Sequence, residues 1–473
     1  MVLPEGFRFG VATAGFQIEG GFNGPGEPQN NWAGWEQAGR VEPSGIALDF
    51  WNRYEDQLDR AAALGSNAFR LSIEWARVEP EAGRIDETAW DNYEAILRAC
   101  ADRGLEPLVT LHHFTHPHWL GEAWWTDLEA PDRFAEWAGR VVDRLGRWCR
   151  SWVTINELNI LAIQSYWTGD FPPGRWASSG DTVRAFDHLL TAHVLAYAEI
   201  SRRQPGATVA TNNFSSSVYE LDRLLIDTLL ARHRGVERHD LRSWLIERRR
   251  DWHAAVGPAS ARERALRRVA AATVPLDRAL PRATAAVYAS PHDLTLDVMQ
   301  VDHYDPYMAR QLRTPGRPTA GGRHWGPTQP LWEQPADPDT YARFVRLNHE
   351  PGLALGIVEN GLCNRVRRGR SYSRDDGWTR PRYLREHLAA TVGLIDAGLP
   401  IDSYFHWTLA DNYEWGSYEP RFGLFGVDRE RGGRWSDLDA MGEDAAGECR
   451  RLFQGLRAGD RSVLDPPATA RHP

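Results

Sequence analysis

Two short motifs each place a glutamate at the end of an apolar, β-branched run. The first spans residues 152–157 (WVTINE) and the second spans residues 355–361 (LGIVENG). Glu157 and Glu359 are far apart in the chain, so only the fold can bring them together. Two carboxyl groups that face each other across a pocket can cleave a glycosidic bond, one as acid and base and the other as nucleophile or as base to a water. The pair therefore predicts glycosyl chemistry.

The elements that would position these glutamates alternate between strand and helix patterns. Six amphipathic helices are predicted, at 49–64, 89–103, 131–148, 181–203, 339–349 and 380–398. Helices that alternate with strands along the chain predict a parallel sheet. Eight strands without a dinucleotide fingerprint favour a closed (β/α)8 TIM barrel over an open sheet. The strands are predicted at 7–14, 67–75, 105–114, 151–158, 208–215, 296–307, 354–361 and 401–409.

Polar residues gather at the ends of seven of these strands, where a barrel of this type carries its chemistry. They are Glu74, His112, His113, Asn156, Glu157, Asn212, Asn213, His303, Tyr304, Glu359, Asn360, His406 and Trp407. We therefore expect one domain over residues 1–458, with no internal linker.

One segment is too long for a simple strand–helix unit. Residues 217–291 are rich in arginine and mostly helical, which predicts a helical insertion between strands five and six, over one barrel mouth. Its charges are interpreted as a solvated helix face in preference to a lid or a docking surface. Residues 459–473, rich in Pro, Ala and Arg, are predicted to be a disordered tail.

Composition excludes several other classes of protein. The net charge of −9 argues against nucleic acid as a partner, and all basic residues are arginine, which removes Schiff-base catalysis. No apolar run could cross a membrane, and the N-terminus lacks a signal-peptide pattern. The four cysteines have no paired spacing, so a reducing cytoplasm is expected. The 21 tryptophans fit a large aromatic core better than a set of sugar platforms.

Four further motifs accompany the two glutamates in a fixed order. They are residues 9–20 (FGVATAGFQIEG), 69–77 (FRLSIEWAR), 110–114 (TLHHF) and 404–415 (YFHWTLADNYEW). With them the chain resembles glycoside hydrolase family 1, the β-glucosidase and β-glycosidase family, over nearly its whole length except residues 217–291. The resemblance implies a retaining mechanism with no cofactor and no metal.

The resemblance also implies a role for each matched residue. Glu157 would be the acid/base and Glu359 the nucleophile, held by Arg70 and Tyr304. Trp407 would stack under the sugar, although a barrel-filling core residue is the alternative. The residues expected to hydrogen-bond sugar hydroxyls are Gln17, His113, Asn156, Glu414 and Trp415.

Physical chemistry attaches expectations to these roles. Arg70 and Tyr304 should lower the pKa of Glu359, whereas the pKa of Glu157 should be raised. Glu414, if ionised, would only accept hydrogen bonds. A retaining enzyme would hold its two catalytic carboxyl groups ~5–5.5 Å apart.

His112 and His406 are predicted to be structural, since no role in the reaction is assigned to them. A metal site from His112, His113, His116 and His118 is conceivable by spacing, but no carboxylate pattern completes it, so no metal is predicted.

The chain departs from the family pattern near the glutamates. Leu158 stands where proline is usual, Asp302-His303-Tyr304 replaces Asn-Tyr-Tyr, and the segment after Trp415 is one residue short. These changes predict intact glycosyl chemistry with an altered aglycone site. Asp302 would either add a third negative charge to the pocket or be neutralised by an arginine or His303.

The leading hypothesis is a cytoplasmic β-glycosidase that acts on small glycosides. The alternatives are a transglycosidase of the same fold and a non-catalytic sugar-binding protein. A preference for glucosides, galactosides or fucosides stays open. The expected partners are a glycoside substrate and, if the chain self-associates, further copies of itself.

Overall fold

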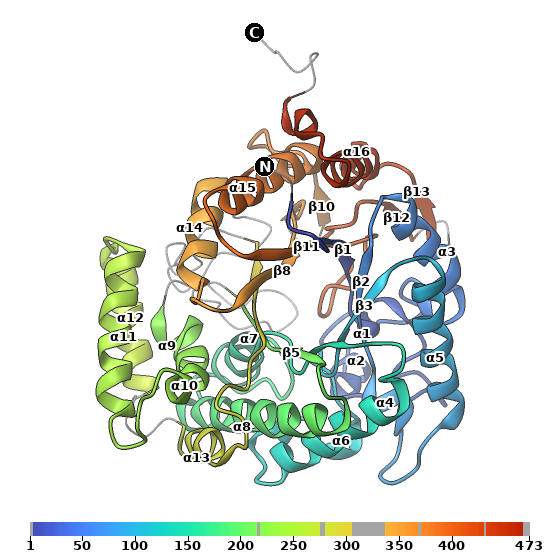
Figure 1. Cartoon of the computed structure of the whole chain (residues 1–473). Helices are drawn as coiled ribbons and strands as arrows, with labels where there is room; N and C mark the ends of the chain where they lie inside the picture. Colours follow the sequence, from blue (N-terminus) through green and yellow to red (C-terminus); the bar gives the residue numbers. More distant parts are fainter. Residues whose placement is uncertain are drawn as a thin grey trace.

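A nearly closed parallel barrel forms the centre of the protein (Figure 1). The computed structural model describes residues 3–214, 218–274, 280–304, 336–367, 370–429 and 432–466. Its main sheet has nine strands in the order β5-β4-β3-β2-β1-β11-β8-β7-β6. They are β1 (Arg8–Ala12), β2 (Ala68–Ser72), β3 (Glu106–Thr110), β4 (Ser151–Val153), β5 (Thr208–Ala210), β6 (Asn212–Phe214), β7 (Val298–His303), β8 (Ala354–Asn360) and β11 (Ile401–Trp407).

Two of the nine segments act as one barrel strand. β5 pairs with β4, β6 pairs with β7, and only Thr211 separates β5 from β6. Counted together they are the fifth of eight strands, each within one of the predicted ranges. The prediction of a (β/α)8 barrel is confirmed.

Helices surround this barrel (Figure 1). Those matching the six predicted patterns are α3 (Phe50–Ala63), α5 (Glu87–Asp102), α6 (Ala130–Leu145), α8 (Ser179–Arg203), α14 (Pro338–Asn348) and α15 (Arg380–Asp396). Local capping explains where several of them begin: the Asp86 side chain accepts hydrogen bonds from Thr88 N and Ala89 N, and Thr379 caps α15.

Further helices and two strand pairs lie outside these patterns. They are α1 (Gly15–Ile18), α2 (Ala33–Gln37), α4 (Trp75–Val78), η1 (His118–Leu120), η2 (Trp124–Thr126), α7 (Leu158–Ile163), η3 (Gln164–Thr168), α16 (Ala445–Arg457), the pair β9 (Arg365–Arg367) and β10 (Arg370–Tyr372), and the pair β12 (Gly426–Asp428) and β13 (Arg434–Ser436). None of the helices in the described part of the chain is both long and apolar enough to cross a membrane.

The strands bury side chains on both faces. Phe69, Leu71 and Trp152 pack toward the helices, whereas Val153 and Phe405 fill the barrel interior. Parallel strands covered on both sides require this continuous apolar character.

The segment predicted as an insertion forms a side layer. It contains α9 (Tyr219–Asp222), α10 (Leu224–His233), α11 (Leu241–Val256), α12 (Ala261–Thr273) and α13 (Pro281–Ala289). The helices α10 and α13 pack together, α13 contacts α8, and α11 contacts α14. Figure 1 shows α11 and α12, in green, at the outer side of the barrel. These helices extend the outer ring, which corrects the expectation that the segment lies over a barrel mouth.

Five charged residues of this side layer and its neighbour form a buried ion network, here called the Arg223 network. Arg223 Nη2 lies 2.8 Å from Asp227 Oδ1, and Arg223 also pairs with Glu350. Arg248 reaches both carboxylates at 2.9 Å, and Arg234 reaches Glu350 at 3.0 Å. The predicted solvated helix face is therefore wrong for Arg223 and Arg248, which anchor the layer.

The C-terminal segment is partly described. Residues 461–464 form the 3-10 helix η6 (Arg461–Leu464), where Arg461 Nη1 lies 2.6 Å from Asp396 Oδ2. Residues 467–473 of the predicted tail lie outside the described residues.

Candidate active site

Three carboxyl groups converge at the carboxyl ends of the barrel strands. One oxygen from each of Glu157, Asp302 and Glu359 lies within 4.8 Å of the others. Their exposed fractions are only 6%, 0% and 3%. The fold thus joins the two glutamates of the predicted pair and adds an aspartate between them. We call Glu157, Asp302 and Glu359 the carboxylate cluster.

Glu157 reaches the cluster through an unusual backbone conformation. It follows β4 and stands at the start of α7 with φ 39° and ψ 61°, in the left-handed region. A non-glycine residue adopts this region only when its surroundings hold it there. Its backbone N–H donates to Asn212 Oδ1 at 3.4 Å. β4 ends at Val153, earlier than the predicted range of 151–158, and the turn at Glu157 brings its side chain to the cluster.

Glu359 reaches the cluster through a β-bulge. In the β7–β8 register Val301 pairs with Ile357, but Asp302 pairs with Glu359, so β8 has one extra residue. Val358 fills the barrel interior. Strict alternation would therefore turn Glu359 outward, and the bulge reverses this. Bulges are often found beside active sites for this purpose.

Arg70 is the central cation of the site and is fully buried. Its Nη1 donates to Glu359 Oε1 at 2.6 Å and to the Val358 carbonyl at 3.2 Å. Its Nε donates to Thr110 Oγ1 at 3.2 Å. The Tyr304 hydroxyl donates to the other Glu359 oxygen, Oε2. Arg70 and Tyr304 therefore hold both oxygens of Glu359, as the family resemblance implied.

Two asparagines connect the remaining members of the site. Arg70 Nη2 donates to Asn156 Oδ1 at 2.5 Å, and Asn212 Nδ2 donates to the same oxygen at 2.9 Å. Asn212 Nδ2 also donates to Asp302 Oδ2. Because two donors fix the Asn156 carbonyl, its amide NH2 is the group available to a ligand. Asn212 was noted only as a strand-end residue, and its contacts depend on neighbours that the sequence does not reveal.

Burial and like charges determine the protonation of the cluster. Burial, then the charges of Asp302 and Glu359, raises the pKa of Glu157 well above its usual value. Burial also raises the pKa of Glu359, and Arg70 and Tyr304 oppose this without reversing it. The expected lowering of the Glu359 pKa is therefore wrong. Its rise is the smaller of the two, since Arg70 and Tyr304 both favour the ionised form.

His303 takes no part in the cluster. It alternates with Asp302 along β7 and packs outward, with its ring centroid 5.2 Å from that of Tyr341 and 5.5 Å from that of Phe344. Burial lowers the pKa of His303 to about 3. It therefore cannot neutralise Asp302. Among the residues that the structure describes, Arg70 is the cation paired with Asp302, and its Nη1 lies 4.0 Å from Asp302 Oδ1.

A second group of predicted residues forms a polar and aromatic wall. Trp407 Nε1 donates to Glu414 Oε1 at 3.0 Å, and Gln17 Nε2 donates to Glu414 Oε2 at 3.3 Å. The His113 ring lies nearly parallel to those of Trp407 and Trp415, with centroids 5.9 and 5.8 Å away. The five predicted sugar-contacting residues named here thus form one connected surface.

The protonation of Glu414 differs from the expectation that its carboxyl group is ionised and only accepts hydrogen bonds. Burial raises the pKa of Glu414 to about 8, against the hydrogen bond from Trp407. Near neutral pH its carboxyl group therefore carries a proton for much of the time and can donate as well as accept. Burial, then the charge of Arg70, lowers the pKa of His113, so its imidazole is neutral.

The neighbouring histidines have structural contacts. Trp125 Nε1 donates to His112 Nε2 at 3.3 Å, and His116 Nε2 lies 3.0 Å from the Gly121 carbonyl. His112, His116 and His406 are buried, and burial lowers the pKa of each. The spacing of the carboxylate cluster could accommodate a cation, but Arg70 already supplies a positive charge there.

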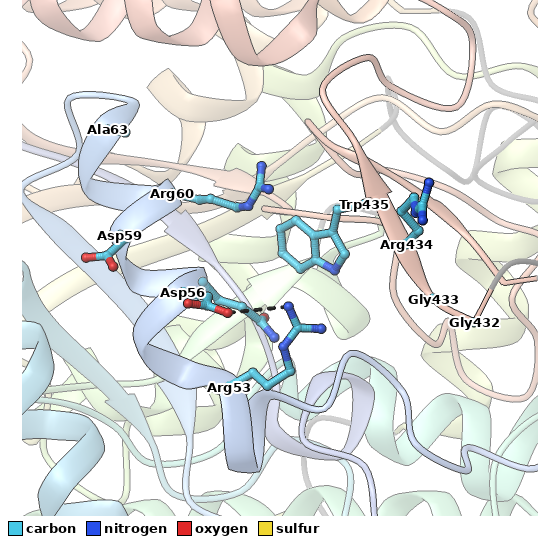
Figure 2. A pocket seen from close by; sticks show the side chains of 10 residues that line it. Arg53, Asp56, Asp59, Arg60, Ala63, Gly432, Gly433, Arg434 and Trp435 are labelled. Atoms are coloured by element: carbon cyan, nitrogen blue, oxygen red, sulfur yellow. Dashed lines mark hydrogen bonds and ion pairs between the residues drawn. The ribbon is translucent and has the colours of Figure 1, made fainter.

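A separate hollow of about 740 Å³ lies on the outer side of the barrel (Figure 2). It lies between α3 and the β12–β13 hairpin, with Arg60 over the Trp435 ring at 5.2 Å. Arg53 and Asp56 form an ion pair of 3.4 Å along its edge. No residue of the predicted active site lines it.

Comparisons with known proteins agree with this geometry. Residues 1–437 match the model of Glycosyl hydrolase family 1. The chain belongs to this family and is a glycoside hydrolase. A bifunctional β-D-glucosidase/β-D-fucosidase from Bifidobacterium breve is 30% identical over 91% of this chain and 95% of its own length.

Two other similar proteins cover almost the same span. A 6-phospho-β-galactosidase from Lacticaseibacillus casei is 27% identical over 90% of this chain and 94% of its own. The solved structure of a β-glucosidase from Thermotoga maritima in complex with azafagomine has a TM-score of 0.71 at 22% identity. It covers 96% of this chain and 99% of its own.

Proposed function

We propose that this chain is a retaining β-glycosidase in which Glu157 is the acid/base and Glu359 is the nucleophile. The observation that carries the assignment is the close approach of their carboxyl oxygens, within 4.8 Å. Retaining enzymes hold their carboxyl groups about 5–5.5 Å apart, whereas inverting enzymes need about 6.5–9.5 Å to admit a water. The short separation leaves room for direct attack by Glu359 on the sugar.

The first step forms a covalent intermediate. A Glu359 oxygen bonds to the anomeric carbon while the glycosidic C–O bond breaks, and Glu157 gives its proton to the departing oxygen. Arg70 and Tyr304 keep Glu359 in place for this attack. The raised pKa of Glu157 keeps its proton available at neutral pH.

The second step releases the sugar. Glu157, now ionised, takes a proton from a water, whose oxygen bonds to the anomeric carbon as the ester bond to Glu359 breaks. The two inversions restore the original configuration. If an alcohol enters in place of water, the same step becomes transglycosylation, so the ratio of transfer product to free sugar measures that alternative.

The surrounding residues support binding of a small, neutral sugar. The Asn156 amide, Gln17, His113, Glu414 and the two tryptophans present donors, acceptors and flat apolar rings. The carboxylate cluster makes the site acidic, which disfavours a sugar phosphate. We therefore infer a β-glucoside or β-fucoside substrate, the class named for the Bifidobacterium breve relative.

Two coarser features complete the proposal. Residues 1–458 act as a single domain, because the Arg223 network ties the side layer of α9 to α13 to Glu350, just before β8 of the barrel. The four cysteines are buried and unpaired, which supports the cytoplasm as its location.

A panel of nitrophenyl glycosides tests this function. Turnover of the β-glucoside or β-fucoside should exceed that of the α-glucoside and of a phosphorylated β-galactoside. Activity on none of them would leave a sugar-binding role. Preference for the phosphorylated substrate would contradict the inferred substrate class.

A further inference from the structure

Asp302 is the member of the carboxylate cluster to which the proposed mechanism gives no role. It is fully buried on β7, with carboxyl groups on both sides: Glu157 after β4 and Glu359 on β8. An ionised carboxylate in such a place has a high energetic cost unless it is paired or hydrogen-bonded. Within the described part of the chain, Arg70 is the one arginine that these three carboxyl groups share.

Two oxygens of the cluster lack a hydrogen-bond donor. Among the described residues, no group donates to Glu157 Oε1 or to Asp302 Oδ1, and both atoms are buried. An oxygen of Glu157 and an oxygen of Asp302 nevertheless lie within 4.8 Å of each other, so that a proton on one group can form a hydrogen bond to the other. Two carboxylates cannot bond in this way, because both only accept. One proton on either group would join them and satisfy both.

The contacts of Asp302 decide where this proton resides. Asn212 Nδ2 donates to Asp302 Oδ2, and Arg70 Nη1 lies 4.0 Å from Asp302 Oδ1. Both contacts favour the ionised form of Asp302. Glu157 Oε1 has no comparable donor. Burial, then the charge of Glu359, raises the pKa of Asp302 as well, but Arg70 and Asn212 oppose this rise.

We propose that Asp302 is a positioning residue that retains the catalytic proton on Glu157 by accepting a hydrogen bond from its carboxyl group. This inference rests on the proposed function of Glu157 as acid/base. Asp302 touches neither the breaking bond nor the attacking oxygen. It acts through Glu157, whose carboxyl group it orients with the proton directed into the cluster until the substrate binds.

Proton and charge balance are maintained through both steps. Before cleavage, Glu157 is protonated while Asp302 and Glu359 are ionised. After cleavage, Glu157 and Asp302 are ionised and Glu359 is a neutral ester, the proton having left with the departing alcohol. The net charge of the cluster with Arg70 is the same in both states. The proton that water gives to Glu157 in the second step restores the first.

Other titratable groups also face Glu157 and Asp302. Glu359 on β8 repels both carboxylates, Arg70 on β2 attracts them, and the Tyr304 hydroxyl stays protonated. His113 after β3 is neutral. Of Glu359, Arg70, Tyr304 and Asp302, only Asp302 can be replaced without removing Glu359 or one of its hydrogen bonds.

The pH–rate profile of Asp302→Asn tests the proposal. Asparagine keeps the shape but removes the charge, so the Glu157 pKa should fall, and the alkaline limb of kcat/KM should move down by about 1–2 pH units. The loss should be larger for a glycoside with a poor leaving group than for a dinitrophenyl glycoside. Asp187→Asn, at a buried aspartate on the outer helix α8, is the matched control and should leave the limb in place. An alkaline limb unmoved in an active Asp302→Asn enzyme would overturn the proposal.

A spectroscopic measurement keeps the test independent of turnover and of how well Asp302→Asn folds. The infrared difference spectrum between wild type and Glu157→Gln at pH 7 should show the loss of one protonated carboxyl band. Persistence of that band would place the proton on Asp302 and contradict the proposal. Inactivity of the wild type on every glycoside would instead reject the proposed function, while this spectrum still reports the position of the proton.

Discussion

The carboxylate cluster and the Arg223 network are both buried groups of charges, but their charge balance differs. In the network, three arginines face two carboxylates. Burial raises the pKa of Asp227, yet Arg223 and Arg248 outweigh it, and the pKa lies below its usual value. In the cluster, three carboxyl groups share Arg70, and the pKa of each is raised. The ion pairs of the Arg223 network hold the side layer in place. In the carboxylate cluster the carboxyl groups outnumber Arg70, so one of them keeps a proton that can be used in catalysis.

The largest effect should follow removal of the nucleophile. Glu359→Ala should reduce hydrolysis of nitrophenyl β-glucoside by at least about 10⁴-fold, because no covalent intermediate can form. Azide or formate should restore turnover by entering the vacated space. Near-normal activity without an added anion would mean that Glu359 is not the nucleophile.

Removal of the acid should give a loss that depends on the leaving group. Glu157→Ala should reduce kcat/KM by about 10²–10⁴-fold for alkyl or phenyl glycosides, which need protonation. Dinitrophenyl glycosides need little help and should be affected far less in the first step. Equal losses for good and poor leaving groups, measured by steady-state kinetics, would contradict the acid role.

The Arg223 network should respond in stability and not in chemistry. Asp227→Asn leaves Arg223 with an incomplete set of partners and should cost about 3–5 kcal/mol in the free energy of unfolding. Because the pKa of Asp227 is lowered in the folded state, this cost should be present at neutral pH and shrink as pH falls toward about 4 and below. Urea denaturation at several pH values measures it, and the pH profile of kcat/KM should be unchanged.

The smallest of these effects has the opposite sign. The folded protein keeps a proton on Glu157 that the unfolded chain releases above about pH 4, so this group destabilises the fold increasingly as pH rises. Glu157→Gln should therefore raise the melting temperature at pH 7, and the gain should fade near pH 4. A variant less stable than wild type at pH 7 would show that Glu157 is ionised and paired in the folded protein, as Asp227 is.

Much of the barrel could be predicted from the sequence, because each strand is a short apolar run followed by polar residues. The runs at 354–361 and 401–409 match β8 and β11 closely. The ordered motifs also indicated Glu157, Glu359 and Arg70, and the family resemblance indicated Tyr304.

The rest depends on contacts between distant segments. The bulge that turns Glu359 inward arises from the pairing of β8 with its neighbours, and Asn212 meets Asp302 only because β6 lies beside β7. Burial raises the pKa of Glu359, and the degree of burial cannot be read from the sequence. Charge runs are ambiguous for the same reason: Arg250 is 76% exposed, whereas the nearby Arg248 is 34% exposed and bridges two carboxylates.

The stereochemistry of the first product tests the retaining mechanism most directly. Proton NMR of the anomeric region during hydrolysis of an aryl β-glucoside should show the β-anomer of the free sugar first, with the α-anomer growing only as the sugar mutarotates. That order follows from the short separation of Glu157 and Glu359 and from two successive inversions. Initial formation of the α-anomer would contradict the nucleophilic role of Glu359 and the account built on it.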